Sequence, residues 1–568
     1  MPSLLLRAVV FSITGLCVAD SVHPRLRPAG RWGRIDRQFL DERAIGRWSG
    51  RGDFSGGNWQ SGSRRNGWTG GGHLSPWQQN GRSSWGTLNQ TSLPKYDKTG
   101  SGGWSGTPWG SITTKNANPY TSAPRGTTKK YHLTISLCDI RPDGVVTKEA
   151  LCVNDQFPGP LIEANYGDDL EITVTNALTN EGTAMHWHGF LQTDNNHNDG
   201  VPGVQQCAIA PGQSMTYKMK AELYGSSWYH THYSSQYAGG ATGPIVVYGP
   251  WNGEYDIDVG PVMLADWYRE EYFNYVKGLM RPLAQGGPVH PLANSNLING
   301  KMKFPCSKTD LPCVDADYAK FNFTSGKNHR LRLMNTGAGA VQKFSIDGHK
   351  MQVIANDYMP IKPYNTTMVS LGVGQRADVI VFGSGKRGEK YWMRSNIVTC
   401  SLNDGKLTEA RAVIYYEGAD TDTLPSAKAN QGPGANPSPL LCGNEPLAKT
   451  IPTYPLAAKK PDAVREFKIE MKSNGTHLLY FFGNQSFRAD FNKPLLENAL
   501  DYSLARLPPR RNFWNLNKAT VARAIIYNYH EAPHPIHLHG HNMQVLAVGI
   551  GKWDGKIVRA ANPMVRCP

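Results

Sequence analysis

From Tyr131 onward the chain consists of short runs in which β-branched and aromatic residues alternate with polar ones. A period of two is the spacing of a β-strand, whose successive side chains point to opposite faces. Gly, Pro, Asn and Asp separate the runs, and long amphipathic helical patterns are hard to find. The clearest runs span residues 130–138, 169–178, 242–250, 329–335, 376–383, 410–416 and 466–472. The pattern predicts an all-β protein of antiparallel β-sandwiches or barrels.

Two composition breaks divide this region into three parts. The first break is YGPWNGEYD (248–256) and the second is ANQGPGANPSP (429–439). A length of 568 residues is enough for three or four domains. We expect domains at 127–250, 251–420 and 463–568, with a linker at 421–462; the third is shorter than a sandwich and is predicted to be incomplete.

Residues 1–19 have the composition of a secretory signal peptide. A basic residue, Arg7, precedes a short apolar run that ends in small residues at Ala19. An N-terminal membrane anchor is the alternative, but the run is shorter than the ~18 residues that a membrane span needs. We expect the segment to be removed and the mature protein to be secreted to the extracellular space without a membrane partner.

Residues 20–126 differ in composition from the rest of the chain. They hold 15 Lys and Arg against 6 Asp and Glu, so most of the net charge of +15 lies here, together with eight of the 15 tryptophans. A nucleic-acid-binding tail is one reading of interleaved Arg, Gly and Trp, although an exported protein rarely meets nucleic acid. The segment has too few aliphatic residues for a core, so a disordered extension or propeptide is favoured. An error in the gene assignment is a third explanation.

The cysteine content fits an exported protein. Eight cysteines remain after residue 19, an even number that favours disulfides, and the lack of a CxxC pair argues against a zinc ribbon. We predict the local pairs Cys306–Cys313, Cys400–Cys442 and Cys138–Cys152. Glycosylation is expected at the five N-x-S/T sequons, at Asn89, Asn322, Asn365, Asn474 and Asn484.

Three H-x-H pairs contain the most informative residues of the chain: His186 and His188, His230 and His232, and His537 and His539. In a strand, residues i and i+2 share a face, so each pair would present two imidazoles side by side. A single H-x-H pair is more often a surface or hydrogen-bonded pair than a metal site. Three pairs supply six imidazoles, more than the four ligands of one zinc ion. They predict a cluster of copper, zinc, iron or nickel rather than a calcium or magnesium site.

The chain from residue 127 onward resembles the multicopper oxidases, and most closely the fungal laccases and laccase-like enzymes. The matching stretches, in family order, are residues 153–168 (VNDQFPGPLIEANYGD), 185–192 (MHWHGFLQ), 199–217 (DGVPGVQQCAIAPGQSMTY), 225–250 and 534–546 (HPIHLHGHNMQVL). The resemblance implies three cupredoxin-like β-sandwich domains. It also implies one-electron oxidation of a reducing substrate, phenolic or similar, coupled to four-electron reduction of dioxygen to water.

The family motifs assign roles to individual residues. His186 and His537 correspond to type 2 copper ligands, and His534 to a ligand of the type 1 copper that accepts electrons from substrate. The type 3 copper ligands would be His188, His230, His232 and His539. Asp199 matches a carboxylate that serves proton delivery near the cluster, although an Asp before Gly is also a common turn residue. His349 and His541 fall outside ligand positions and are interpreted as structural.

The resemblance departs from the family pattern at the end of the printed sequence. The family's type 1 site takes a Cys thiolate and a further histidine from a segment beyond the NPM turn, whereas the sequence here ends at NPMVRCP (562–568). Cys567 has no neighbouring histidine, and Cys207 lacks the C-terminal cysteine with which such enzymes pair it. We therefore expect six cluster histidines in place of eight, an incomplete type 1 site and negligible oxidase activity in this polypeptide.

Two kinds of alternative remain open at this stage. One is a copper-binding protein without oxidase activity. The other is an ascorbate or metal-ion oxidase of the same family, because no carboxylate lies between Asn335 and Phe344, where many fungal laccases have an acidic residue that accepts the phenol proton. Dioxygen and a small reducing molecule are the expected partners, and a monomer is the expected state.

Overall fold

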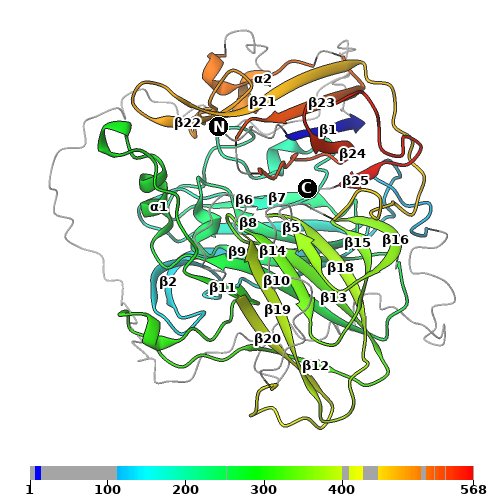
Figure 1. Ribbon diagram of the computed structural model, residues 1–568. Helices are drawn as coiled ribbons and strands as arrows, with labels where there is room; N and C mark the ends of the chain where they lie inside the picture. The colour runs from blue at the N-terminus through cyan, green and yellow to red at the C-terminus, as the bar shows by residue number, and fades with distance from the viewer. Residues whose placement is uncertain are drawn as a thin grey trace. The chain divides into compact units, whose positions relative to one another are not determined.

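A computed structural model shows that the regular secondary structure of the chain is almost entirely β-strand (Figure 1). It describes residues 7–14, 112–250, 252–398, 409–426, 445–500, 507–516, 518–530 and 533–566. These residues form 25 strands and two α-helices, which confirms the predicted all-β class. All of them belong to one compact unit made of residues 1–17 and 75–568.

The first sandwich packs two four-stranded sheets, with the orders β3-β2-β5-β7 and β4-β9-β8-β6. Its strands are β2 (Thr128–Ile140), β3 (Thr147–Val153), β4 (Ile162–Asn165), β5 (Asp169–Asn176), β6 (Met185–Trp187), β7 (Ser214–Lys220), β8 (Gly225–Thr231) and β9 (Thr242–Tyr248). In β5 the side chains of Leu170, Ile172 and Val174 are buried and those between them are more exposed, as the sequence alternation requires. Ala117, near the end of the predicted extension, is buried in the same core.

The second sandwich has a six-stranded sheet, β11-β10-β13-β18-β15-β16, and a five-stranded sheet, β12-β20-β19-β14-β17. Its strands are β10 (Ile257–Trp267), β11 (Ser295–Ile298), β12 (Ala319–Phe323), β13 (Asn328–Asn335), β14 (Val341–Ile346), β15 (Met351–Asn356), β16 (Met359–Thr366), β17 (Val369–Leu371), β18 (Arg376–Phe382), β19 (Lys390–Val398) and β20 (Glu409–Tyr416). Helix α1 (Tyr272–Leu279) follows β10, and the Glu271 carboxylate caps it by accepting a hydrogen bond from the Phe273 amide at 3.0 Å.

The sheets are mixed rather than purely antiparallel. Where consecutive strands pair with each other, they run antiparallel, as predicted. Five other pairs run parallel: β2 with β5, β4 with β9, β10 with β13, β12 with β20, and β21 with β23. None of these pairs is consecutive in the chain, because a parallel pair needs a crossover connection.

The described residues from 445 onward form one sheet, where each preceding sandwich has two. Its order is β22-β21-β23-β1-β24-β25. The strands are β21 (Ala463–Ser473), β22 (Leu478–Phe482), β23 (Val521–Asn528), β24 (Met543–Ile550) and β25 (Met564–Arg566), with helix α2 (Leu495–Leu500) after β22. Ile525 and Tyr527 belong to one apolar cluster and Ala524 and Ile526 to another, so the sheet has a small core on each face.

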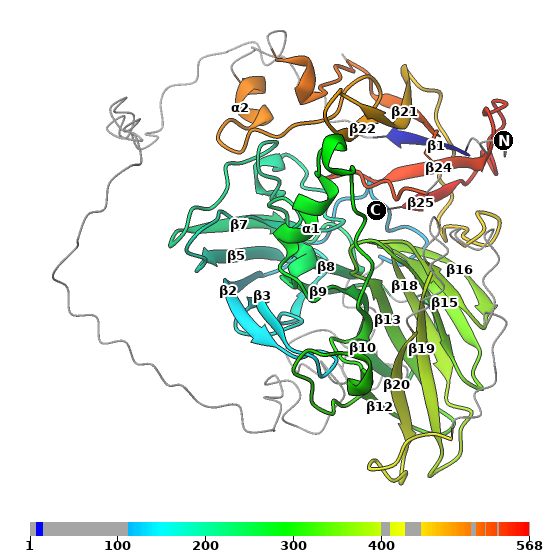
Figure 2. The same ribbon diagram turned by 60° about the vertical axis from the view of Figure 1, so that its left-hand side comes forward.

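The central strand of this sheet comes from the other end of the chain. Strand β1 (Arg7–Thr14) lies beside β24 in both views (Figures 1 and 2). It pairs antiparallel with β23 and β24, so that Val10 is opposite Ile525 and Ala547. Removal of residues 1–19 as a signal peptide stays a prediction. In the printed chain, β1 pairs with β23 on one side and with β24 on the other. Without it, the facing edges of these two strands would be unpaired.

Two of the predicted disulfides are present. Cys138 is joined to Cys152 and Cys306 to Cys313. Cys207 is exposed and has no disulfide partner among the described residues. Cys400, Cys442 and Cys567 lie outside the described part of the chain.

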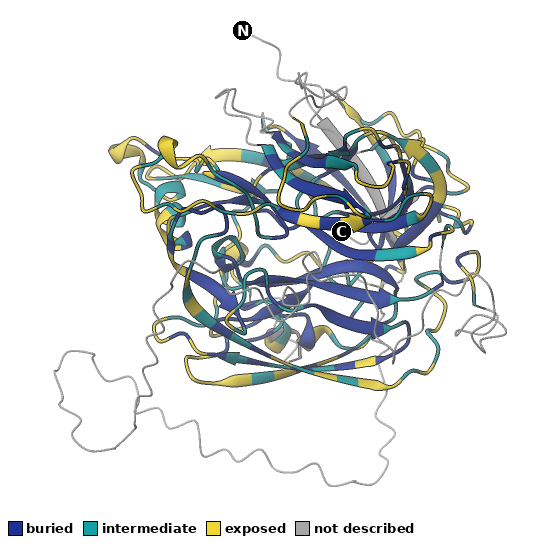
Figure 3. Cartoon of the chain, turned by 90° about the horizontal axis from the view of Figure 1, so that it is seen from below, coloured by how far each residue is buried: buried dark blue, intermediate teal, exposed yellow. Residues whose placement is uncertain are grey.

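Burial follows the sheets: strand residues are mostly buried and the connecting loops are more exposed (Figure 3). Among the described residues no helix is long and apolar enough to cross a membrane.

A proline at position 10 tests the pairing of β1 in the full-length chain. Val10→Pro removes a backbone N–H from a strand that is paired on both sides, which leaves a carbonyl group without its donor and costs about 1–3 kcal/mol. We expect a lower temperature of unfolding and faster proteolysis of residues 463–566. Val10→Thr, which keeps the N–H, is the matched control; equal stability of the two variants would show that β1 is not part of the folded sheet.

Candidate metal centre

Two adjacent strands of the first sandwich position the first two histidine pairs. β6 and β8 run antiparallel with His186 directly opposite His230, and Trp187 opposite Tyr229. Neighbouring positions of a strand face opposite sides, so the two aromatic residues enter the first core while the two histidines face away from it. His188 and His232 follow directly after β6 and β8.

The third histidine pair lies on a loop. His537 and His539 belong to the irregular segment between β23 and β24, so the prediction of a strand at this pair is wrong. Their ring centroids are 4.3 Å apart with an angle of 60° between the planes, a spacing that the loop achieves without the regular geometry of a strand.

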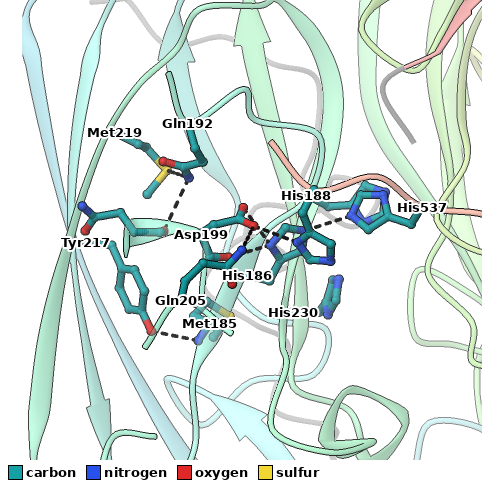
Figure 4. Close-up of polar contacts among 12 residues, drawn as sticks. Met185, His186, His188, Gln192, Asp199, Gln205, Tyr217, Met219, His230 and His537 are labelled. Atoms are coloured by element: carbon teal, nitrogen blue, oxygen red, sulfur yellow. Dashed lines mark hydrogen bonds and ion pairs between the residues drawn. The ribbon is translucent and has the colours of Figure 1, made fainter. Parts of the chain in front are cut away.

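The structure brings the six imidazoles of the three pairs together, from the first sandwich and from the loop between β23 and β24. Figure 4 shows four of them, His186, His188, His230 and His537. His188 stacks on His537 with a centroid distance of 4.2 Å, and His186 lies 4.1 Å from His539. His232 completes the group at 5.2 Å from His539. Two sets of three have ligand atoms within 4.8 Å of one another: His186, His188 and His230, and His186, His537 and His539.

Hydrogen bonds orient three of these rings. Nδ1 of His186 donates to the Asp199 carbonyl at 2.7 Å, Nδ1 of His230 donates to the Thr231 carbonyl at 3.1 Å, and Nδ1 of His539 contacts the Asp199 carboxylate at 2.8 Å. A proton on Nδ1 leaves Nε2 as the nitrogen with a free lone pair, which is the arrangement of metal-binding histidines.

Other ring nitrogens of the group have no such partner. Both nitrogens of His188 and Nδ1 of His537 are buried and make no hydrogen bond to any described residue. An unsatisfied buried polar atom costs about 1–3 kcal/mol, and coordination to a metal would remove this cost. The donor set therefore fits a metal ion that binds imidazole.

Burial favours the neutral form of four of these imidazoles. Desolvation, reinforced by neighbouring histidines, lowers the pKa of His188, His230 and His537 well below the usual value. The pKa of His232 falls to about 3 for the same reasons, burial first and then His539. Neutral imidazole is the form that binds metals, so these side chains need not lose a proton to do so.

Asp199 connects the histidines of the first sandwich with those of the loop between β23 and β24. Its Oδ1 lies 3.3 Å from Nδ1 of His186, its Oδ2 accepts from His539, and Gln205 donates to Oδ2 at 3.1 Å. Burial alone would raise the pKa of this carboxyl, but the two histidines outweigh it and hold the pKa well below its usual range. Asp199 is also a turn residue, because Gly200 follows it with φ of +89°.

His534 lies outside this group. Nε2 of His534 is 3.0 Å from Nδ1 of His530, and both rings lie nearly perpendicular to the ring of Tyr480. Within the described residues, no set of three potential ligands includes His534. His530 belongs to none of the sequence motifs, and its only signal in the sequence is its spacing of four residues from His534.

The two histidines interpreted as structural also lie outside the group of six. His349 is buried in the second sandwich, with Nδ1 2.7 Å from the Asp347 carbonyl and Nε2 2.6 Å from the Tyr416 hydroxyl. His541 donates to the His539 carbonyl at 3.0 Å and so stabilises the loop that carries two of the six rings.

Comparison with known proteins gives consistent matches along the chain. Three multicopper oxidase family models match residues 134–251, 258–419 and 476–567. The chain is 36% identical to oxidoreductase OpS5 of Beauveria bassiana, over 78% of this chain and 75% of that protein. It is 35% identical to laccase-2 of Botryotinia fuckeliana, over 77% and 74%. The crystal structure of a laccase from Botrytis aclada superimposes with a TM-score of 0.72 at 32% identity, covering 80% of this chain and 83% of that one.

Asp199→Ala tests the role of the bridging carboxylate. The variant leaves His539 without its acceptor and His186 without a nearby charge, and loss of such supporting contacts typically weakens metal binding about 10–100-fold. We expect that decrease in copper affinity, measured by competition with a chelator. Asp169→Ala, which removes an exposed carboxylate paired with Lys220, is the control; equal affinities in the two variants would contradict the bridging role.

Proposed function

The chain belongs to the laccase-like multicopper oxidases, and we propose that it couples one-electron oxidation of small phenolic or similar reducing substrates to the four-electron reduction of dioxygen. Four substrate molecules each lose one electron and one proton, and dioxygen takes up the four electrons and four protons to give two molecules of water. The observation that carries the proposal is the convergence of six imidazoles, none more than partly exposed, from two parts of the fold.

We assign the copper ligands by combining the family motifs with this arrangement. His186 and His537 are the proposed type 2 ligands, and their Nε2 atoms lie 3.3 Å apart. The proposed type 3 ligands are His188, His230, His232 and His539. When bound, the copper ions would supply the electron storage that joins one-electron oxidations to a four-electron reduction.

Asp199 is the residue best placed to handle protons at this site. Its carboxylate contacts two proposed ligands, His186 and His539, and it also accepts a hydrogen bond from the half-buried Gln205. A carboxylate in contact with the cluster histidines can accept a proton transiently and pass it on near the place where dioxygen is reduced. Proton delivery by Asp199 is therefore part of the proposal.

The proposed entry point for electrons is His534, at the type 1 position. Among the described residues its nearest imidazole partner is His530, and no described cysteine joins them in a three-ligand set. This observation favours a second candidate function for the printed polypeptide, copper binding without oxidase activity. Phenols are the proposed substrate class because of the laccase relatives, while ascorbate and metal ions are the alternatives. Secretion, glycosylation and a monomeric state complete the proposal.

Copper content, colour and oxygen consumption of the printed 568-residue polypeptide test these proposals together. We expect copper to bind through the six clustered imidazoles. A blue absorption band with oxygen consumption in the presence of a phenol would support the oxidase, whereas copper binding without either would support the second candidate function, because a blue site requires a thiolate ligand. A blue protein that consumes oxygen would show that a ligand outside the described residues completes the type 1 site. A protein that binds no copper would overturn the proposed cluster.

Removal of a single ligand tests the assignment of the cluster. His186→Ala removes an imidazole that contacts members of all three pairs, so bound copper per chain should fall. His197→Ala removes an exposed imidazole of the same sandwich and is the matched control. The assignment fails if both variants retain the copper content of the unmodified chain, as measured by elemental analysis.

A further inference from the structure

A loop of the second sandwich lies directly against one of the proposed copper ligands. The segment 372–375 precedes β18, and Gly374 in it has φ of +80°. A Cβ atom at Gly374 would lie 2.9 Å from Cε1 and 3.2 Å from Nε2 of His188. The backbone of this loop therefore packs on the edge of the His188 ring, which also stacks on His537.

Arg376, at the start of β18, ties this loop to the histidine-bearing strand β8. Its guanidinium is fully buried; Nη1 donates to the Gly374 carbonyl at 3.0 Å and Nε donates to the Ser226 carbonyl at 3.1 Å. Asp357 pairs with Nη1 at 3.2 Å and also accepts from the Arg376 amide at 3.0 Å. One side chain thus joins Gly374 to a residue four positions before His230.

A second set of buried polar groups holds the same strand. The Ser226 hydroxyl donates to Asp378 at 2.6 Å and accepts from Arg332 at 3.1 Å. The next hydroxyl, on Ser227, donates to the carbonyl of His188. Burying charged groups carries a large desolvation penalty and often adds no net stability, so their concentration beside the histidines indicates a role in positioning.

We propose that Gly374 and Arg376 are positioning residues of the copper cluster: Gly374 forms a wall without a side chain that sets the place of the His188 ring, and Arg376 fixes that wall to β8. The second sandwich, which contributes none of the six imidazoles, would in this way determine the cluster geometry. This inference rests on the proposed function, because it treats His188 as a copper ligand.

Two glycine variants with matched backbone cost provide the test. Gly374→Ala places a methyl group against His188, whereas Gly388→Ala, at φ of +86° with no atom within 4 Å, imposes a similar backbone strain in open space. Both chains should lose thermal stability in the metal-free form through backbone strain, and Gly374→Ala should lose more because its methyl group meets the His188 ring. Only Gly374→Ala should lower copper affinity, by about tenfold or more, and change the electron paramagnetic resonance spectrum of bound copper.

A double variant keeps the test informative if Gly374→Ala folds poorly. His188→Ala removes the ring that the new methyl group would meet, so adding Gly374→Ala to it should cause no further loss of copper. If Gly374→Ala still lowers copper binding when the His188 ring is absent, the proposed role of Gly374 as a wall for that ring is wrong. Arg376→Lys should also lower copper affinity, while Arg394→Lys, at a buried arginine of the second sandwich that pairs with Asp347, should leave it unchanged.

The outcomes separate this inference from the proposed function. An unmodified chain that holds no copper would overturn both. An unmodified chain that holds copper, with equal affinities and spectra for Gly374→Ala and Gly388→Ala, would overturn the inference alone.

Discussion

The antiparallel pairing of β6 with β8 is the constraint on which the rest of the site depends. It places His186 opposite His230 and Trp187 opposite Tyr229, so one register determines both the core packing and the direction of the imidazoles. A shift of one residue would exchange the two faces, moving the aromatic side chains out of the core and the histidines into it. The packing of Trp187 and Tyr229 in the core therefore stabilises the register that orients His186 and His230.

Burial gives the histidine cluster its chemical character. Desolvation favours the neutral form of His188 and His537, and the protein leaves ring nitrogens of both without a hydrogen-bond partner among the described residues. Such a site is costly to hold together when empty, which links metal binding to folding stability. Asp199 moderates the cost, because one buried carboxylate contacts both His186 and His539.

Much of the fold could be predicted because strand alternation is a local property. The run 169–178 shows the predicted burial pattern, and the local disulfide Cys306–Cys313 is present. Other features had no local signal. The loop conformation at His537 depends on β23 and β24 on either side, and the proximity of His530 to His534 depends on how that loop turns. The place of β1 depends on strands more than 500 residues away in the chain.

The sequence by itself determined that the chain forms β-strands and that three H-x-H pairs offer imidazoles for a metal cluster, since both follow from the stereochemistry of neighbouring residues. Only the tertiary structure decided which imidazoles meet, that Asp199 reaches a histidine 340 residues away, and that Arg376 of the second sandwich holds a strand 150 residues before it. These contacts depend on how strands align and sandwiches pack, and that information is distributed over the whole chain instead of residing in any one motif.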